Sequence, residues 1–202
     1  MRSGLDPAER VEALFTDRLI LDRVTSRDVD DVHAVFRDPA TWQHLPAGQY
    51  VLREQSERLV TRSDESWERV GLGDWAVRAV AVPGLAAGAF VGIVGVTRAE
   101  LDAGVVLNLG YRLDPSAWGR GIATEASAAA RDAAARVQPD LPLTARALTA
   151  NPASIRVLER VGLSEVWRGT VEADGITAGM ELVVSSDRVL ADDVLDGIIA
   201  LG

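Results

Sequence analysis

The sequence predicts an α/β fold in a single domain, with a mostly antiparallel, twisted central sheet flanked by helices. Segments of strand composition alternate along the chain with segments of helical periodicity. Three strand candidates follow one another with only short turns between them, which is typical of an antiparallel meander, and an alanine-rich helix pattern starts directly after the third. A chain of 202 residues can bury one substantial core, and no repeat or linker divides it. The three strand candidates are Trp75–Val82, Phe90–Thr97 and Val105–Leu113.

Four elements are predicted before the meander. The sequence D-P-A-E at residues 6–9 reads as a capping box with proline at the first helical position, which predicts a short helix through about Leu14. A strand is expected over residues 19–24, and Ser26 is expected to cap the next helix. After an irregular segment, a helix is predicted over residues 52–67. The apolar positions expected to face the core from these two helices are Val29, Val32, Phe36, Leu52, Leu59 and Trp67.

The elements after the meander are predicted from caps and periodicity. The alanine-rich helix carries a stripe of small side chains from Ile122 to Val137, which would let it approach the sheet closely. A strand is expected over residues 143–149, and Asn151 then begins a helix that ends at Gly162, a typical left-handed C-terminal position. Closing strands are predicted over residues 166–171 and 180–184, followed by a helical tail over residues 185–202, with apolar Val189 and Ile198, that packs on the body or on a second subunit.

Composition and net charge argue against several classes of partner and cofactor. The net charge of −9 argues against nucleic acid as a partner and favours solubility or, less directly, a cationic substrate. No apolar run approaches the ~20 residues that cross a membrane, and the first residues lack a signal-peptide core, so we expect a cytoplasmic protein. With no cysteine and only two separated histidines, no metal site is expected, and no cysteine can carry an acyl group.

Gly119 and Gly121 suggest a phosphate-binding loop. They stand between a strand and a helix, where unobstructed N–H groups from Trp118 to Thr124 can converge beside a helix N-terminus. A P-loop would need a lysine after the glycines, and a dinucleotide fingerprint would need a third glycine where Thr124 stands. A pyrophosphate loop for coenzyme A remains, with a plain tight turn as the alternative.

Two longer motifs carry a resemblance to a known family. The stretch L-G-Y-R-L-D-P-S-A-W-G-R-G-I-A-T-E-A over residues 109–126 resembles the acetyl-CoA motif of the GCN5-related N-acetyltransferases (GNAT), and N-P-A-S-I-R-V-L-E-R-V-G-L over residues 151–163 resembles a second motif of the group that acetylates N-termini of ribosomal proteins. The opening strand T-D-R-L-I-L-D-R-V at residues 16–24 is also typical of that group. The resemblance implies a core over about residues 16–184, with the sheet split between its two central strands.

The resemblance also implies the activity. Acetyl-CoA would be the co-substrate and a primary amine the acceptor, with a protein N-terminal α-amine or N-terminal peptide as one candidate. Direct attack in a ternary complex follows, and a homodimer is compatible with the resemblance. Two alternatives stay open: acetylation of a small amine such as an antibiotic or polyamine, and an acyl-CoA-binding regulatory protein without catalysis.

The resemblance assigns roles to individual residues. Ser154 is the expected proton donor to the departing thiolate, although it would also suit the first turn of any helix. Asn151 is expected to bond the pantetheine besides capping its helix. From its place between the glycines, Arg120 is expected either to add charge at the phosphates or to be a solvated loop residue. The residues expected to bind the cofactor are Tyr111, Leu113, Trp118, Gly119, Arg120, Gly121, Ile122, Ala123, Thr124 and Asn151.

The general base is the least defined part of the expected site. Many relatives carry glutamate two residues before the Gly-Tyr of the strand, whereas this chain has Asn108, whose amide cannot take up a proton at working pH. Glu100 and Asp102 are the nearest carboxylates in sequence, and proton loss to water is the alternative. The resemblance places the wall of the acceptor site in the region that holds Trp42, His44 and Trp67, and packing of the two tryptophans in the core is the alternative.

Overall fold

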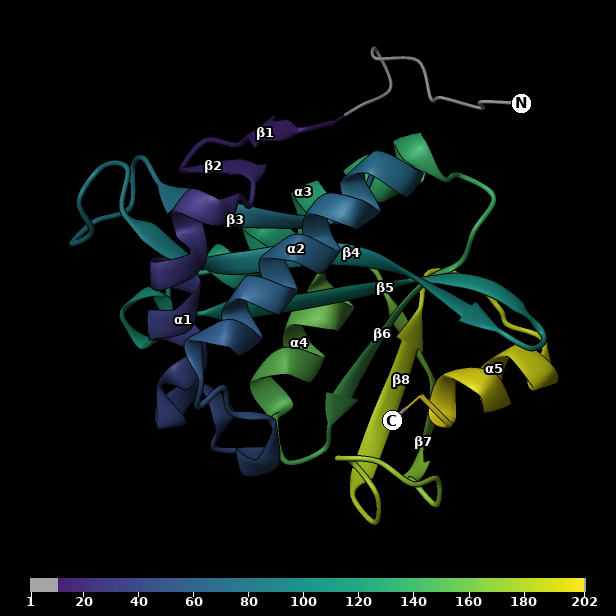
Figure 1. The fold of residues 1–202 in the computed structure, drawn as a ribbon. Helices are drawn as coiled ribbons and strands as arrows, with labels where there is room; N and C mark the ends of the chain where they lie inside the picture. Colours follow the sequence, from purple (N-terminus) through teal and green to yellow (C-terminus); the bar gives the residue numbers. More distant parts are fainter. Residues whose placement is uncertain (1–10, 202) are drawn as a thin grey trace.

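The computed structural model describes residues 11–201, and its strands form one eight-stranded sheet in the order β1-β2-β3-β4-β5-β6-β8-β7 (Figure 1). Every neighbouring pair is antiparallel except β5 and β6, which run parallel. The predicted α/β class with a mostly antiparallel sheet is therefore confirmed. The strands are β1 (Ala13–Phe15), β2 (Leu19–Arg23), β3 (Asp74–Ala79), β4 (Phe90–Leu101), β5 (Gly104–Leu113), β6 (Leu143–Leu148), β7 (Ser164–Thr170) and β8 (Glu181–Ser186).

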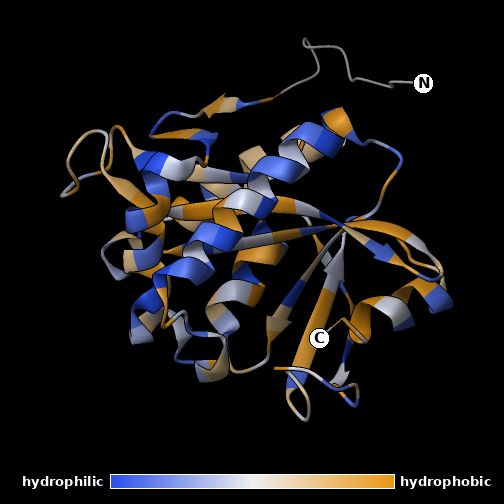
Figure 2. Ribbon diagram, viewed as in Figure 1, coloured by the Kyte–Doolittle hydropathy of each residue, from blue (hydrophilic) through white to orange (hydrophobic). Residues whose placement is uncertain are grey.

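Helices cover both faces of the sheet. The buried side chains of α1 and the middle of α2 pack with Ile93 of β4, whereas α3 and α4 pack with Val94 and Val96. Side chains alternate between faces along a strand, so Ile93 and Val94 mark opposite faces. Figure 2 shows hydrophobic colour along the central strands and hydrophilic colour along the outer side of α2. The helices are α1 (Val29–Arg37), α2 (Arg53–Val70), α3 (Ile122–Val137), α4 (Pro152–Arg160) and α5 (Asp192–Ile199).

The small side chains of α3 let this helix lie close to the sheet. Ile122, Ala126, Ala130 and Ala133 are all fully buried, against the leucines that β5 directs to the same face. Because alanine adds little bulk, the start of α3 is held near the end of β5. The predicted stripe is confirmed, and it fixes where the glycine loop between β5 and α3 must lie.

The parallel pair β5–β6 is joined over a short distance only. Its register contains two positions, Leu107 with Leu143 and Asn108 with Thr144, after which the strands separate. Toward its other neighbour, β5 remains paired with β4 along its whole length. The sheet is therefore split between its two central strands beyond Asn108, as the sequence motifs implied.

One glycine permits the close approach of β4 to β5 beside the split. Gly92 has φ +134, and a Cβ at this position would clash with the Arg112 carbonyl oxygen. A β-bulge in the β3–β4 pairing lies next to it, where Val77 pairs with Gly92 and Arg78 pairs with Phe90. Only glycine fits this conformation and this spacing. The end of β5 is thus held firmly along one edge while its other edge is free of a partner strand.

Three local predictions at the start of the chain are corrected. Residues 6–9 of the predicted first helix lie outside the described residues, but Ala13 and Leu14 belong to β1, which pairs with β2. Thr25, not Ser26, caps the next helical segment, because Ser26 begins a 3-10 turn (Ser26–Asp28) ahead of α1 and Thr25 shares a capping box with Asp28. Leu52 is exposed, since α2 begins one residue after it.

The C-terminal tail packs on the body of the domain. Ile198 of α5 is fully buried in a cluster with Val106, Val184 and other side chains of β5, β7 and β8. Val189, by contrast, is 94% exposed and does not join the core as its apolar side chain suggested. None of the helices within residues 11–201 has the length and apolar character needed to cross a membrane.

Candidate active site

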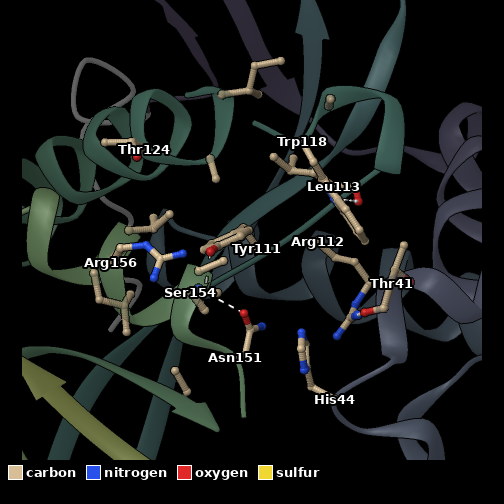
Figure 3. A pocket seen from close by; sticks show the side chains of 18 of the residues that line it. Thr41, His44, Tyr111, Arg112, Leu113, Trp118, Thr124, Asn151, Ser154 and Arg156 are labelled. Carbon is tan, nitrogen blue, oxygen red and sulfur yellow. Dashed lines mark hydrogen bonds between the residues drawn. The ribbon is translucent and has the colours of Figure 1, made fainter. Parts of the chain in front are cut away.

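A cleft of about 520 Å³ opens where β5 and β6 separate (Figure 3). Its walls come from four regions that are distant in sequence: the turns after α1, the end of β5 with the loop that follows, the end of β6, and α4. The lining residues are 40–45, 109–113, 117–119, 121–124, 146–148, 151, 153–154, 156–158 and 160.

The glycine loop forms one end of the cleft. Gly119 and Gly121 have φ +71 and +76, the left-handed region that side chains disfavour, and Gly121 is the N-cap of α3. Trp118 stabilises the preceding turn by donating from its indole Nε1 to the Leu113 carbonyl at 3.0 Å. All three residues line the cleft, together with Ile122, Ala123 and Thr124 of the first turn of α3. The loop thus turns the open N-terminus of α3 toward the cavity.

Arg120 does not join its loop neighbours. Its guanidinium donates to the Ser116 carbonyl at 2.9 Å and to the Pro83 carbonyl at 2.5 Å, and it is not among the lining residues. The expected charge at the phosphates would therefore have to come from elsewhere. Arg156 and Arg160, exposed residues on α4 that line the cleft, are positively charged groups that the sequence motifs did not single out.

A set of hydrogen bonds behind the glycine loop, the Arg18–Glu125 clamp, was not predicted from the sequence. The Glu125 carboxylate accepts hydrogen bonds from the Thr16 hydroxyl at 2.5 Å and from the Arg18 Nε at 2.7 Å. Arg18 in turn donates from Nη1 to the Arg120 carbonyl at 3.0 Å, inside the glycine loop. Glu125 therefore faces away from the cleft and ties the hairpin of β1 and β2 to the start of α3. The link spans more than a hundred residues, so no local pattern reveals it.

Asn151, Ser154 and Tyr111 form a hydrogen-bonded group on the opposite wall. The Asn151 side-chain oxygen accepts the Ser154 N–H at 3.1 Å, which confirms Asn151 as the N-cap of α4. The Tyr111 hydroxyl donates to the Ser154 Oγ at 3.3 Å. Burial raises the pKa of the Tyr111 phenol, and the Ser154 hydrogen bond opposes this only in part. The cleft therefore contains a protonated phenol in contact with the serine predicted to donate a proton.

The carboxylates considered for the general base lie elsewhere. Glu100 and Asp102 flank the hairpin at the far end of β5, and neither they nor Asn108 line the cleft. No aspartate or glutamate among residues 11–201 lines it. His44 does so, from the turns after α1, and imidazole is the side chain that most often exchanges protons near neutral pH.

Two of the three residues predicted for the acceptor wall line the cleft. Trp42 and His44 both line the cleft. Trp67 instead packs edge-to-face against Trp75, with ring centroids 4.9 Å apart, and is 2% exposed. It belongs to the core, because α2 directs its C-terminal turns against the sheet.

The cleft is electropositive although the chain is acidic. Its charged lining side chains are four arginines, Arg112, Arg146, Arg156 and Arg160. Burial lowers the pKa of the Arg112 guanidinium to about 10 and lowers the pKa of Arg146 as well. The net charge of −9 thus does not describe the site, and its weak indication of a cationic ligand is not supported by the lining residues.

A family model described as an acetyltransferase (GNAT) domain matches residues 18–164, well over half of the chain. The chain therefore belongs to the GNAT acetyltransferases, enzymes that use acetyl-CoA for N-acetylation. Of the residues assigned from the sequence motifs, all except Arg120 line the cleft that this family fold creates.

Solved structures share the fold at low sequence identity. An acetyltransferase from Agrobacterium tumefaciens is 22% identical, with a TM-score of 0.67 over 91% of this chain and 98% of that chain. RimL, a ribosomal L7/L12 α-N-protein acetyltransferase solved in complex with coenzyme A, is 16% identical, with a TM-score of 0.69 over 89% of this chain and 98% of RimL. A ribosomal-protein-S5-alanine acetyltransferase from Vibrio fischeri is 17% identical, with a TM-score of 0.65 over 90% of this chain and 98% of that chain.

The glycine loop yields a first prediction. Replacing Gly121 by valine places a β-branched side chain at φ +76, which rotates the N–H groups at the start of α3. We expect Gly121→Val to remove the rise in melting temperature that acetyl-CoA gives the parent protein.

Gly179→Val is the matched control. Gly179 has φ +73, a Cβ added there would meet no heavy atom within 4 Å, and the residue lies outside the cleft, between β7 and β8. This variant should lose a similar amount of stability and keep the full acetyl-CoA shift. An unchanged shift in Gly121→Val, measured by differential scanning calorimetry, would show that the loop does not hold the cofactor.

Proposed function

We propose that this protein transfers the acetyl group of acetyl-CoA to a primary amine by direct attack within a ternary complex. The observation that carries the proposal is the split between β5 and β6, which leaves the edge of β5 open inside a cleft that ends at a glycine loop. Membership in the GNAT acetyltransferases supports the reaction class.

The edge of β5 supplies a series of backbone donors. The Leu107 N–H bonds the Pro142 carbonyl on the β6 side, whereas the Asp114 N–H bonds Val91 of β4. Since N–H directions alternate along a strand, the N–H groups of Leu109, Tyr111 and Leu113 face the split. The amide-bearing pantetheine arm would lie along this edge as a neighbouring strand does, with one N–H placed to stabilise the oxyanion of the thioester carbonyl.

The two ends of the cofactor would be held by different groups. The pyrophosphate would lie at the N–H groups of residues 118–124, where the α3 dipole favours negative charge. Arg156 and Arg160 would balance the remaining phosphate charge. The Asn151 side-chain amide keeps its N–H donors for the pantetheine, because only its oxygen is engaged in capping α4.

The transfer itself needs a proton acceptor and a proton donor. The neutral amine attacks the thioester carbon, the new C–N bond forms, the C–S bond breaks, and the amine nitrogen loses a proton. His44 is the proton acceptor that the lining residues offer, with solvent as the alternative. The departing thiolate takes a proton from Ser154, and Tyr111 returns one to Ser154 through their hydrogen bond.

The acceptor class is the finer part of the proposal. A protein N-terminal α-amine is favoured by the motif resemblance, and such an amine is partly neutral at cellular pH, with a pKa of about 8. A small amine is the second candidate. The third, an acyl-CoA-binding protein without catalysis, is motivated by Asn108 alone.

Thiol release from acetyl-CoA, followed on mixing with a panel of amines and N-terminal peptides, tests the proposal. Sustained amine-dependent release is expected, and tight acetyl-CoA binding without release would instead establish the non-catalytic protein. In the same assay, His44→Gln should lower kcat/KM for the amine without changing acetyl-CoA affinity. A parental kcat/KM in His44→Gln would assign the proton to solvent.

The Tyr111–Ser154 pair provides a further prediction. Ser154→Ala should lower kcat by roughly 10- to 100-fold, because a positioned acid typically contributes ~10²–10⁴ and coenzyme A thiolate is a tolerable leaving group. Tyr111→Phe should lower kcat less. If Tyr111 acts through Ser154, the double variant should be no slower than Ser154→Ala, since effects on one relay are not additive.

Alanine is a good helix former and Asn151 still caps α4, so the fold of Ser154→Ala should be intact. Weaker acetyl-CoA binding with unchanged kcat would make Ser154 a cofactor contact. Fully additive losses in the double variant would rule out the relay.

A further inference from the structure

An arginine without an acidic partner lies in the wall of the cleft. Arg112 follows Tyr111 on β5, so the two side chains project to opposite faces of the sheet. Tyr111 meets Ser154 of α4, whereas Arg112 extends toward the turns after α1, where Trp42 and Thr41 lie (Figure 3). Arg112 therefore belongs to the side of the cleft that carries His44, away from the glycine loop.

Three other arginines of restricted exposure are paired with carboxylates. Arg18 pairs with Glu125 at 2.5 Å, Arg23 pairs with two carboxylates of α2, and Arg78 pairs with Asp22 and Asp28. Arg146 has no carboxylate partner among residues 11–201 either, but its guanidinium is engaged by the backbone carbonyls of Ile198 and Leu201. Within residues 11–201, no carboxylate lies at ion-pair distance from Arg112.

The Arg112 guanidinium is held in place but is not saturated. Its Cζ lies 3.2 Å from the centroid of the Trp42 ring and 5.3 Å from that of Phe36, and Nη1 donates to the Thr41 carbonyl. A guanidinium has five N–H donors, so this single hydrogen bond leaves most of them without a protein acceptor. Aromatic contacts fix its plane and leave its polar edge for a ligand.

The groups around Arg112 favour an anionic ligand. Arg112 is half-buried and has no carboxylate partner among residues 11–201, and burial lowers the pKa of its guanidinium. A bound anion would supply a counter-ion, whereas a polycationic acceptor would meet the positive charge of Arg112 and, among residues 11–201, no lining carboxylate. A planar carboxylate matches the fork of a fixed guanidinium by two parallel hydrogen bonds.

We propose that Arg112 binds a carboxylate on the acceptor, so that the substrates of this enzyme are amines that also carry a carboxylate. This inference rests on the proposed amine acetylation and names its substrate class. The carboxylate can belong to the amine-bearing residue itself, as in a free amino acid, or to an acidic side chain that follows the N-terminal residue of a peptide.

Two matched pairs of acceptors test the proposal and distinguish these sources. Alanine is compared with alaninamide, and the C-terminally amidated dipeptide Ala-Glu with amidated Ala-Gln. In at least one pair, the carboxylate member should have a kcat/KM roughly 10- to 100-fold higher, the range expected for a hydrogen-bonded charge pair. Arg112→Gln should bring that ratio to about one while the acetyl-CoA-induced rise in melting temperature stays parental.

Arg23→Gln is the control, because Arg23 also lies over an aromatic ring, Trp67, but outside the cleft. It should keep the parental preference. Should Arg112→Gln fail to fold, Arg112→Lys should retain a reduced preference. Equal kcat/KM values in both pairs for the parent enzyme, or an undiminished preference in Arg112→Gln, would overturn the proposal.

A failure of the proposed function would look different. If acetyl-CoA binds but neither pair of acceptors is acetylated, the proposed amine acetylation fails for these acceptors. Whether Arg112 binds a carboxylate is then tested by measuring ligand binding, which needs no turnover. Calorimetric titration of the coenzyme A complex with N-acetylalanine and N-acetylalaninamide should show tighter binding of the carboxylate, lost in Arg112→Gln. Equal binding of the two would overturn the assignment of Arg112.

Discussion

The site depends on the unequal pairing of β5. One edge of this strand is joined to β4 along its length, helped by the close approach that Gly92 allows, while the other edge is released from β6 after Asn108. Backbone donors on a released edge need partners, because unpaired polar groups away from water cost free energy. The pleat of β5 directs Tyr111 and Arg112 to opposite faces of the sheet, and the release from β6 leaves the glycine loop at the end of the split.

The parts of the site that the sequence could predict are those determined by neighbouring residues. The Gly119–Gly121 turn and the Asn151 cap each depend on a few adjacent positions, where left-handed glycines and side-chain caps have direct sequence signals. The strands of the meander were predictable for the same reason, since short turns bring consecutive strands together.

What the sequence could not predict depends on contacts between distant segments. The D-P-A-E motif suggested a helix through Leu14, but pairing with β2 makes residues 13–15 a strand. The clamp of Arg18 on Glu125 and on the glycine loop joins opposite ends of the domain. Both Trp42 and Trp67 stand among polar neighbours in the sequence. Tertiary packing buries both side chains, but only Trp42 also lines the cleft. The net charge of −9 suggested a cationic ligand, but net charge carries no information on which side chains line the cleft, and four of them are arginines.

The central claim is that acetyl-CoA binds along the released edge of β5 as an additional strand. Amide hydrogen exchange measured by NMR, with and without acetyl-CoA, tests it at single residues. Slower exchange is expected at Leu109, Tyr111 and Leu113, whose N–H groups face the split, with little change at Gly110 and Arg112, whose N–H groups already face β4. Binding that leaves the exchange of these three amides unchanged would contradict the account.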